Sequence, residues 1–145
     1  MPDMVFGCRP FIVMEEVVRL EDYIIVTNNP LVRDREESRH AVEYHETGIR
    51  EILEIIRNKV HVGQRLLTHP LSGSVKPGET PYKSVLMTRG KEPVDLMSVE
   101  LIQSAIEACG KFSFKSEEYD ERAMRDFRII DWTLISSALE SADSF

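Results

Sequence analysis

Hydrophobic and polar positions along the chain fall into two patterns. Short β-branched or aromatic runs predict strands, whereas apolar residues spaced three and four apart predict helices. Five segments carry the strand pattern: residues 23–27, 41–45, 65–68, 82–88 and 127–130. Helical patterns lie between most of them, so the chain is expected to alternate strands with helices.

The most regular helical pattern spans residues 49–60. Apolar side chains recur on one helical face, and they are Ile49, Ile52, Leu53, Ile56 and Val60. Thr47 stands at a capping position, and Gly63 follows the last turn, where glycine commonly ends a helix. A shorter helix is predicted over residues 30–38, because Asn29 followed by proline matches the preferred N-cap and first helical residue.

Two further helices are predicted toward the C-terminus. Asp95 is expected to cap one that ends at Gly110, and Asp131 to cap the last one, after the strand at 127–130. Residues 117–125 are interpreted as a charged helix or loop. Strands joined through helices favour an α/β fold, a three-layer sandwich with a mainly parallel or mixed sheet of about four to five strands. The third and fourth strands are joined by a loop, so an antiparallel pairing stays open for them.

The domain organisation follows from where this regular pattern begins. The chain has 145 residues, enough for one domain of ordinary size. Residues 21–145 are predicted to form a single α/β domain. Residues 1–20 carry no regular pattern and are interpreted as an N-terminal extension, with a mis-assigned start site as the alternative.

Composition and charge exclude several classes of function. Lys and Arg number 18 against 25 Asp and Glu, a net charge of −7, and such a surface repels phosphate backbones. We therefore expect no nucleic-acid partner. No apolar run approaches the roughly 18 residues of a membrane span, and the N-terminus lacks the basic start of a signal peptide. The two cysteines are far apart, and the protein is expected to be cytoplasmic.

Candidate chemistry gathers where strands end. In open α/β sheets, ligands bind beyond the carboxyl ends of strands, and a polar turn and a long loop are predicted there. Hydroxyls, glycine amides and lysines in these segments predict contacts to an anion or a partner. The candidate binding residues are Thr27, Asn28, Asn29, Thr68, His69, Ser72, Gly73, Ser74, Lys76, Thr80, Tyr82 and Lys83. The loop matches neither recognised phosphate-binding glycine motif, and Asn29 also fits a simple N-cap.

His69 is the candidate general acid or base, because the pKa of an unperturbed histidine lies near working pH. It has no visible nucleophile or carboxylate partner, so a hydrogen-bonding role in the loop is the alternative. Ser72 and Ser74 lie in no nucleophile elbow. His40 and His45 are predicted to face opposite sides of a strand, and the sequence therefore indicates no metal site and no cofactor.

The segments at residues 24–30 and 66–85 resemble the GrdX family, and the resemblance extends from about residue 23 to the C-terminus. These are small proteins encoded with the glycine, sarcosine and betaine reductase systems of anaerobic bacteria. The resemblance implies a metabolic setting without an established activity.

Two hypotheses follow. The first is a non-catalytic accessory or assembly factor of the reductase system, with subunits of the reductase complex as partners. The second is a protein or enzyme that binds a small carboxylate or phosphate through the loop at residues 68–83. The lack of a complete catalytic set in the sequence favours the first, and enzyme activity, the ligand and the oligomeric state are left open.

Overall fold

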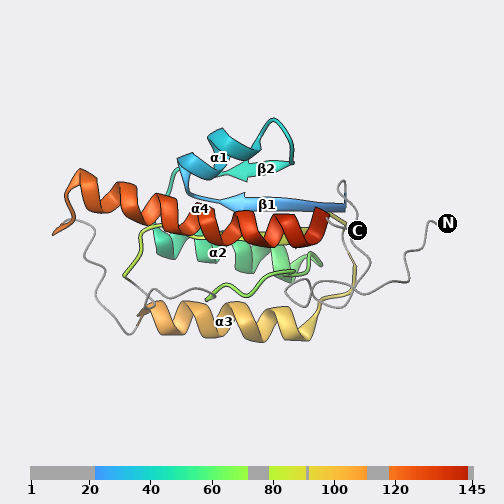
Figure 1. The fold of residues 1–145 in the computed structure, drawn as a ribbon. Coiled ribbons are helices and arrows are strands. Elements are labelled where there is room, and N and C mark those ends of the chain that lie inside the picture. The colour runs from blue at the N-terminus through green and yellow to red at the C-terminus, as the bar shows by residue number, and fades with distance from the viewer. Residues whose placement is uncertain (1–21, 72–78, 91, 111–117, 144–145) are drawn as a thin grey trace.

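The computed structural model describes residues 22–71, 79–90, 92–110 and 118–143. Within these ranges the chain forms three strands and four helices (Figure 1). In chain order they are β1 (Tyr23–Thr27), α1 (Pro30–Glu36), β2 (Val42–Tyr44), α2 (Ile49–His61), β3 (Ser84–Thr88), α3 (Leu96–Gly110) and α4 (Glu121–Asp143). No helix in these ranges is long and apolar enough to cross a membrane.

The strands form a mixed sheet in the order β2-β1-β3. β1 pairs in parallel with β2 and antiparallel with β3. Thr27, the last residue of β1, lies opposite both Tyr44 at the end of β2 and Ser84 at the start of β3. One edge of the sheet therefore collects the carboxyl ends of β1 and β2 and the amino end of β3.

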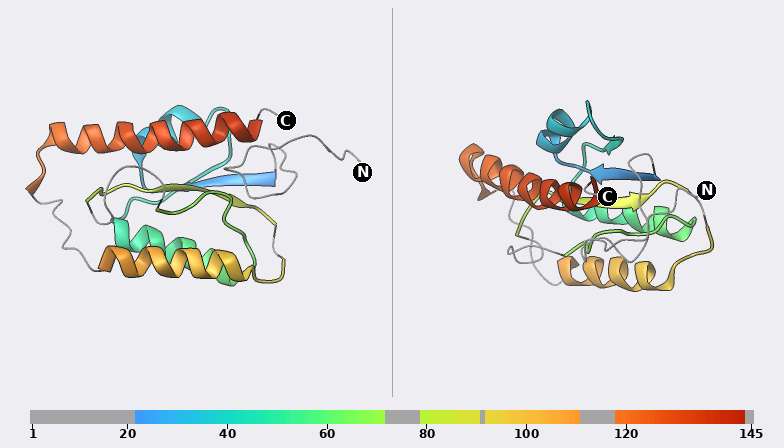
Figure 2. Two further views of the ribbon diagram at one scale, coloured as in Figure 1. Left: turned by 60° about the horizontal axis from the view of Figure 1, so that its bottom comes forward. Right: turned by 45° about the vertical axis from the view of Figure 1, so that its right-hand side comes forward.

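Helices cover both faces of this sheet. Successive strand residues point to opposite sides, so Ile25 packs in a core with α1 and α4, whereas Val26 packs in a second core with α2 and α3. Figures 1 and 2 show α4 on one side of the strands and α2 with α3 on the other. The near-continuous burial of β1 and β3 follows from this coverage on two sides.

Local signals explain most helix boundaries. The Asn29 side chain accepts a hydrogen bond from the Leu31 amide, which confirms the predicted N-cap of α1. Asp95 likewise accepts from the Ser98 amide at 3.0 Å ahead of α3. Thr47 was expected to cap α2, but the N-cap is Gly48 and no side chain caps that helix.

The predicted number of strands is wrong, because the described residues contain three strands instead of four or five. In the third predicted strand only Leu66 forms a bridge, opposite Met87. The Leu66 amide donates to the hydroxyl of Ser98 at 3.0 Å, so side-chain acceptors replace part of a ladder there. The antiparallel direction of the bridge agrees with the pairing that the loop connection left open.

The segment at residues 127–130 is not a strand but part of α4, which runs unbroken through Asp131. Asp131 is therefore no N-cap. A short apolar run cannot be assigned to a strand or a helix by periodicity alone. The buried positions of α4 recur at helical spacing, and they are Asp131, Ile135, Ala138, Leu139 and Ala142. These positions follow the segment, and the helix continues through residues 127–130 back to Glu121.

Gly63 ends the turn after α2 with φ of 105°, and a Cβ there would meet the carbonyl oxygen of Glu92 at 2.1 Å. Gly63→Ala is therefore expected to lower the free energy of unfolding by about 2 kcal/mol or more, from backbone strain and steric clash. Chemical denaturation measures the loss. Gly90→Ala is the control, because a Cβ at Gly90 meets nothing within 4 Å, and an equal effect of the two substitutions would contradict the assignment.

Candidate functional site

The connections after β1 and β2 leave the sheet toward opposite faces. α1 follows β1 and places Val32 in the core shared with α4, while α2 follows β2 and places Ile52 in the core shared with α3. Two neighbouring parallel strands whose connections diverge leave a crevice between their carboxyl ends, which is the usual ligand position in open α/β sheets. The topology therefore predicts that a ligand would bind between the carboxyl ends of β1 and β2.

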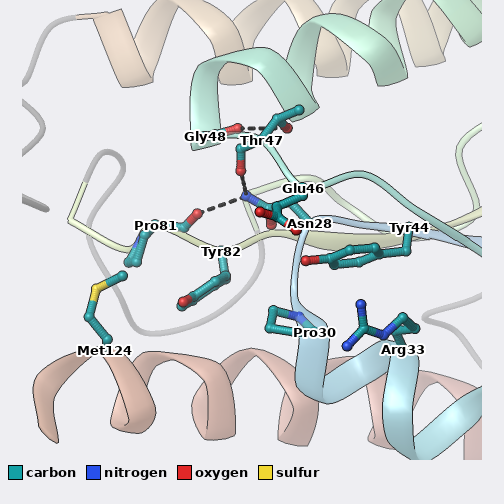
Figure 3. Close-up of a pocket in the computed structure, with 10 residues that line it drawn as sticks. All are labelled: Asn28, Pro30, Arg33, Tyr44, Glu46, Thr47, Gly48, Pro81, Tyr82 and Met124. Atoms are coloured by element: carbon teal, nitrogen blue, oxygen red, sulfur yellow. Dashed lines mark hydrogen bonds between the residues drawn. The ribbon is translucent and has the colours of Figure 1, made fainter. Parts of the chain in front are cut away.

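A pocket of about 490 Å³ lies at this position. Its walls come from the turn after β1, α1, the end of β2 with the start of α2, the segment before β3, and α4. Figure 3 shows the lining residues, which are Asn28, Pro30, Arg33, Tyr44, Glu46, Thr47, Gly48, Pro81, Tyr82 and Met124. Prolines, tyrosine rings and a methionine contribute apolar surface, and Asn28, Arg33, Glu46 and Thr47 contribute polar groups.

The Asn28 side chain links three of these walls through hydrogen bonds. Its Nδ2 donates to the carbonyl oxygens of Thr47 and Pro81, both at 2.9 Å, and its Oδ1 accepts from the Lys83 amide at 2.9 Å. The side-chain donors and acceptor of Asn28 are thus engaged by backbone groups. Asn28, predicted as a ligand residue, lines the pocket and also joins the turn after β1 to the segments around Thr47 and Pro81.

Two arginine–tyrosine pairs flank the pocket. The guanidinium carbon of Arg33 lies 4.5 Å from the ring centre of Tyr44, and Arg33 Nε donates to Asp34 at 2.9 Å. Arg128 lies 5.8 Å from the ring centre of Tyr82 and donates to its hydroxyl at 3.0 Å. Each tyrosine ring thus has a guanidinium contact that favours its observed position.

The groups left to contact a ligand are mainly donors. The two terminal nitrogens of Arg33 and the hydroxyl of Tyr44 form no hydrogen bond with any residue that the structure describes. The hydrogen bond to Asp34 raises the pKa of Arg33, so its charge is permanent. Burial raises the pKa of Tyr44, which keeps its hydroxyl a donor. A guanidinium and a hydroxyl together suit a carboxylate or phosphate oxygen, with Glu46 as an acceptor on the lining.

Behind the pocket lies a buried polar network centred on Asp131, which is 5% exposed. Its carboxylate accepts from the Ser84 amide at 3.1 Å, from the Ser84 hydroxyl at 2.7 Å and from Asn29 Nδ2 at 3.0 Å. Thr27 Oγ1 lies 2.6 Å from Ser84 Oγ and accepts from the Asn29 amide. Thr27 and Asn29, both predicted as ligand residues, are therefore structural members of this network.

The remaining predicted site residues are only partly brought together. Tyr82 lines the pocket, whereas Lys83 does not, and burial lowers the pKa of the Lys83 ammonium. Thr80 accepts from the Tyr82 amide at 3.2 Å. Thr68 accepts from the Leu86 amide and His69 from the Leu71 amide, and neither lines the pocket. The other four predicted residues lie outside the described part of the chain, and they are Ser72, Gly73, Ser74 and Lys76.

Sequence reasoning missed Arg33, Tyr44 and Glu46. A signal for Tyr44 and Glu46 was present, since both follow from the rule about strand carboxyl ends once residues 41–45 are assigned as a strand. Arg33 lay in a mixed-charge run without any such signal. As for metals, the described part of the chain holds no group of three or more His, Cys, Asp or Glu side chains that could bind an ion.

These features define an α/β protein with a tyrosine-lined pocket between the carboxyl ends of two parallel strands. Residues 24–140 match the family model described as GrdX-like protein, and the chain belongs to this family. The match covers the described sheet except Tyr23, and nearly all of α4. No curated protein and no solved structure matches the chain.

Asp131→Ala is expected to lower the free energy of unfolding by about 3 kcal/mol, because the buried Ser84 amide would lose its acceptor and Asn29 Nδ2 would keep only the Arg128 carbonyl oxygen. Burial raises the pKa of Asp131 against the opposing effect of its hydrogen bonds and of Lys83. The native state therefore binds this proton more tightly than the unfolded state, so its contribution to stability falls as pH rises from about 4 through the raised pKa.

Denaturation midpoints measured across this pH range check both effects. The Asp131→Asn variant has no proton to bind at this position, so the fall with pH that Asp131 causes should be absent from its profile. Wild-type and Asn profiles of identical shape would contradict the pH assignment, and an Ala variant as stable as the wild type would contradict the role of the network.

Proposed function

We propose that this chain is an accessory or assembly factor of an amino-acid reductase system of the glycine, sarcosine or betaine type. Its membership of the GrdX-like family, together with the setting that the sequence resemblance implies, supports this role. The observation that carries the proposal is the lining of the pocket. The described lining offers two tyrosines and an arginine, and it includes no serine, cysteine or histidine.

This lining suits recognition of another protein. Tyrosine and arginine dominate the residues that carry binding energy in protein interfaces. Tyr44 and Tyr82 are each held by an arginine, so little side-chain freedom remains to be lost on binding. The pocket, with Tyr44 and Tyr82 as its anchors, is therefore the proposed docking site for a subunit of the reductase complex.

Tyr44→Ala and Tyr82→Ala are each expected to weaken association with purified reductase components by roughly tenfold or more, because each removes an anchor of the docking site. Isothermal titration calorimetry against each component measures the affinity. Gln103→Ala is the matched control, since Gln103 is exposed on α3 and lies outside the pocket. Circular dichroism verifies that every variant folds.

Two results would refute the docking role. One is a wild-type protein that binds no reductase component at micromolar concentration. The other is binding that both tyrosine variants retain in full while their folds remain intact.

A second candidate is a protein that binds a small carboxylate or phosphate in the same pocket. It is favoured by the terminal nitrogens of Arg33 and the Tyr44 hydroxyl, which have no hydrogen-bond partner among the described residues. A guanidinium binds such anions through two parallel hydrogen bonds. In this second candidate function the anion binds at Arg33, whereas the sequence predicted binding through the loop at residues 68–83.

A thermal-shift screen tests it with glycine, betaine, acetyl phosphate and inorganic phosphate. A ligand at about a hundred times its Kd adds about 2.7 kcal/mol, which corresponds to a rise of roughly 5–10 °C in Tm. Arg33→Ala should abolish the shift, and Arg89→Ala, an exposed arginine beyond the opposite end of β3, should retain it. No shift with any probe, or an equal shift in both variants, would count against an anion at Arg33.

A further inference from the structure

The outward side of α4 combines apolar and short polar residues. Its inward side packs through Ile135, Ala138, Leu139 and Ala142 in the core that includes β1, β3 and α1. On the outside, Ile129, Ile130 and Leu134 remain 42%, 38% and 38% exposed, three large apolar side chains within two turns. Thr133 and Ser137 are exposed beside them and are short enough to let a second helix approach closely.

Opposite charges flank this apolar segment. Arg122 and Glu140 are both exposed, and neither forms a hydrogen bond or ion pair with any described residue. They lie 18 positions apart, which at about 3.6 residues per turn is five turns, so both stand on the same side of the helix. Their midpoint along the helix axis is at the level of residue 131, whose own side chain faces the core, and Ile129 and Ile130 come just before this level.

We propose that α4 packs antiparallel against α4 of a second copy of this chain, about a two-fold axis near position 131. This arrangement places Arg122 of each copy opposite Glu140 of the partner subunit, at both ends of the contact. Along the helix, Ile129 lies between the two ion pairs on the same side as the charges, and the exposed Asp126 shares that side. Ile130 and Leu134 lie about 80° and about 120° around the helix from the charges, at the margin of the contact. A contact that is the same on both copies closes on itself and yields a dimer instead of a filament.

The helix dimensions agree with this pairing. Five turns separate the two charges by about 27 Å, so each ion pair lies about 13 Å from the axis, and Ile129, Thr133 and Ser137 of both copies lie between the pairs. Parallel packing would instead oppose Arg122 to the Arg122 of the other copy, and Glu140 to Glu140. The charges therefore select the antiparallel orientation, and Ile129 of each copy adds apolar contact near the axis.

Sedimentation velocity over a concentration series from micromolar to millimolar tests the proposal. A single helix pair buries a small area, so the wild type is expected to be a weak dimer that dissociates on dilution. Arg122→Glu and Glu140→Arg should each weaken the dimer at least fivefold, because each places two pairs of like charges in the contact. The double variant should regain the wild-type affinity, since it only exchanges the positions of the charges.

Mixing the two single variants provides a second, independent readout. At one end of the mixed dimer, the acid introduced at position 122 faces the base introduced at position 140. At the other end, the native Glu140 and Arg122 face each other, so a dimer should reappear. Arg89→Glu, a charge reversal outside α4, is the control, and circular dichroism verifies the fold. The proposal would be overturned by a wild type that stays monomeric at millimolar concentration. It would also be overturned if Arg122→Glu and Glu140→Arg left the affinity of the dimer unchanged.

Discussion

The arrangement of this protein depends on one buried carboxylate. Asp131 lies midway along α4, yet its three hydrogen bonds all go to the strand-end edge of the sheet, to Ser84 at the start of β3 and to Asn29 after β1. An apolar contact between a helix and a sheet tolerates sliding and rotation, whereas a carboxylate with three fixed donors accepts only one position. Asp131 therefore sets the axial and rotational position of α4 over the sheet.

The hydrogen bonds of Asp131 also determine the geometry of the pocket. Arg128 lies nearly one turn before Asp131, and its carbonyl oxygen accepts from Asn29 Nδ2 at 2.9 Å. Because α4 is fixed there, the Arg128 guanidinium reaches the hydroxyl of Tyr82, and Met124, one turn further, lines the pocket. The far end of α4 is tied by a second carboxylate, Asp143, which accepts from the Tyr23 hydroxyl and lies 2.9 Å from His40 Nε2.

The sequence predicted features that depend on local chemistry. The Asn29 cap, the α2 pattern and the stop at Gly63 each need only neighbouring residues, and the structure confirms all three. The errors concern segments whose state is decided by distant partners. Residues 127–130 were predicted as a strand because four apolar or long side chains fit either state, and only the burial of Asp131 against Ser84 reveals a continuous helix.

The difference between local and distant partners also explains why the sequence predicted the candidate site only in part. A polar residue after a strand can face a ligand or can satisfy buried backbone groups, and sequence spacing does not separate these cases. Asn28 and Asn29 proved to be of the second kind because their partners come from residues 47, 81, 83, 128 and 131, all remote in sequence.

A residue whose polar atoms are all engaged by the protein cannot also be the main contact of a ligand without breaking those bonds, which costs about 1–3 kcal/mol for each buried group left unpaired. The groups that remain open to a ligand are therefore the terminal nitrogens of Arg33 and the hydroxyl of Tyr44, which form no hydrogen bond with the described residues. The conspicuous polar turn after β1 serves as the frame of the pocket, and the ligand-facing groups belong to a helix and a strand end on either side of it.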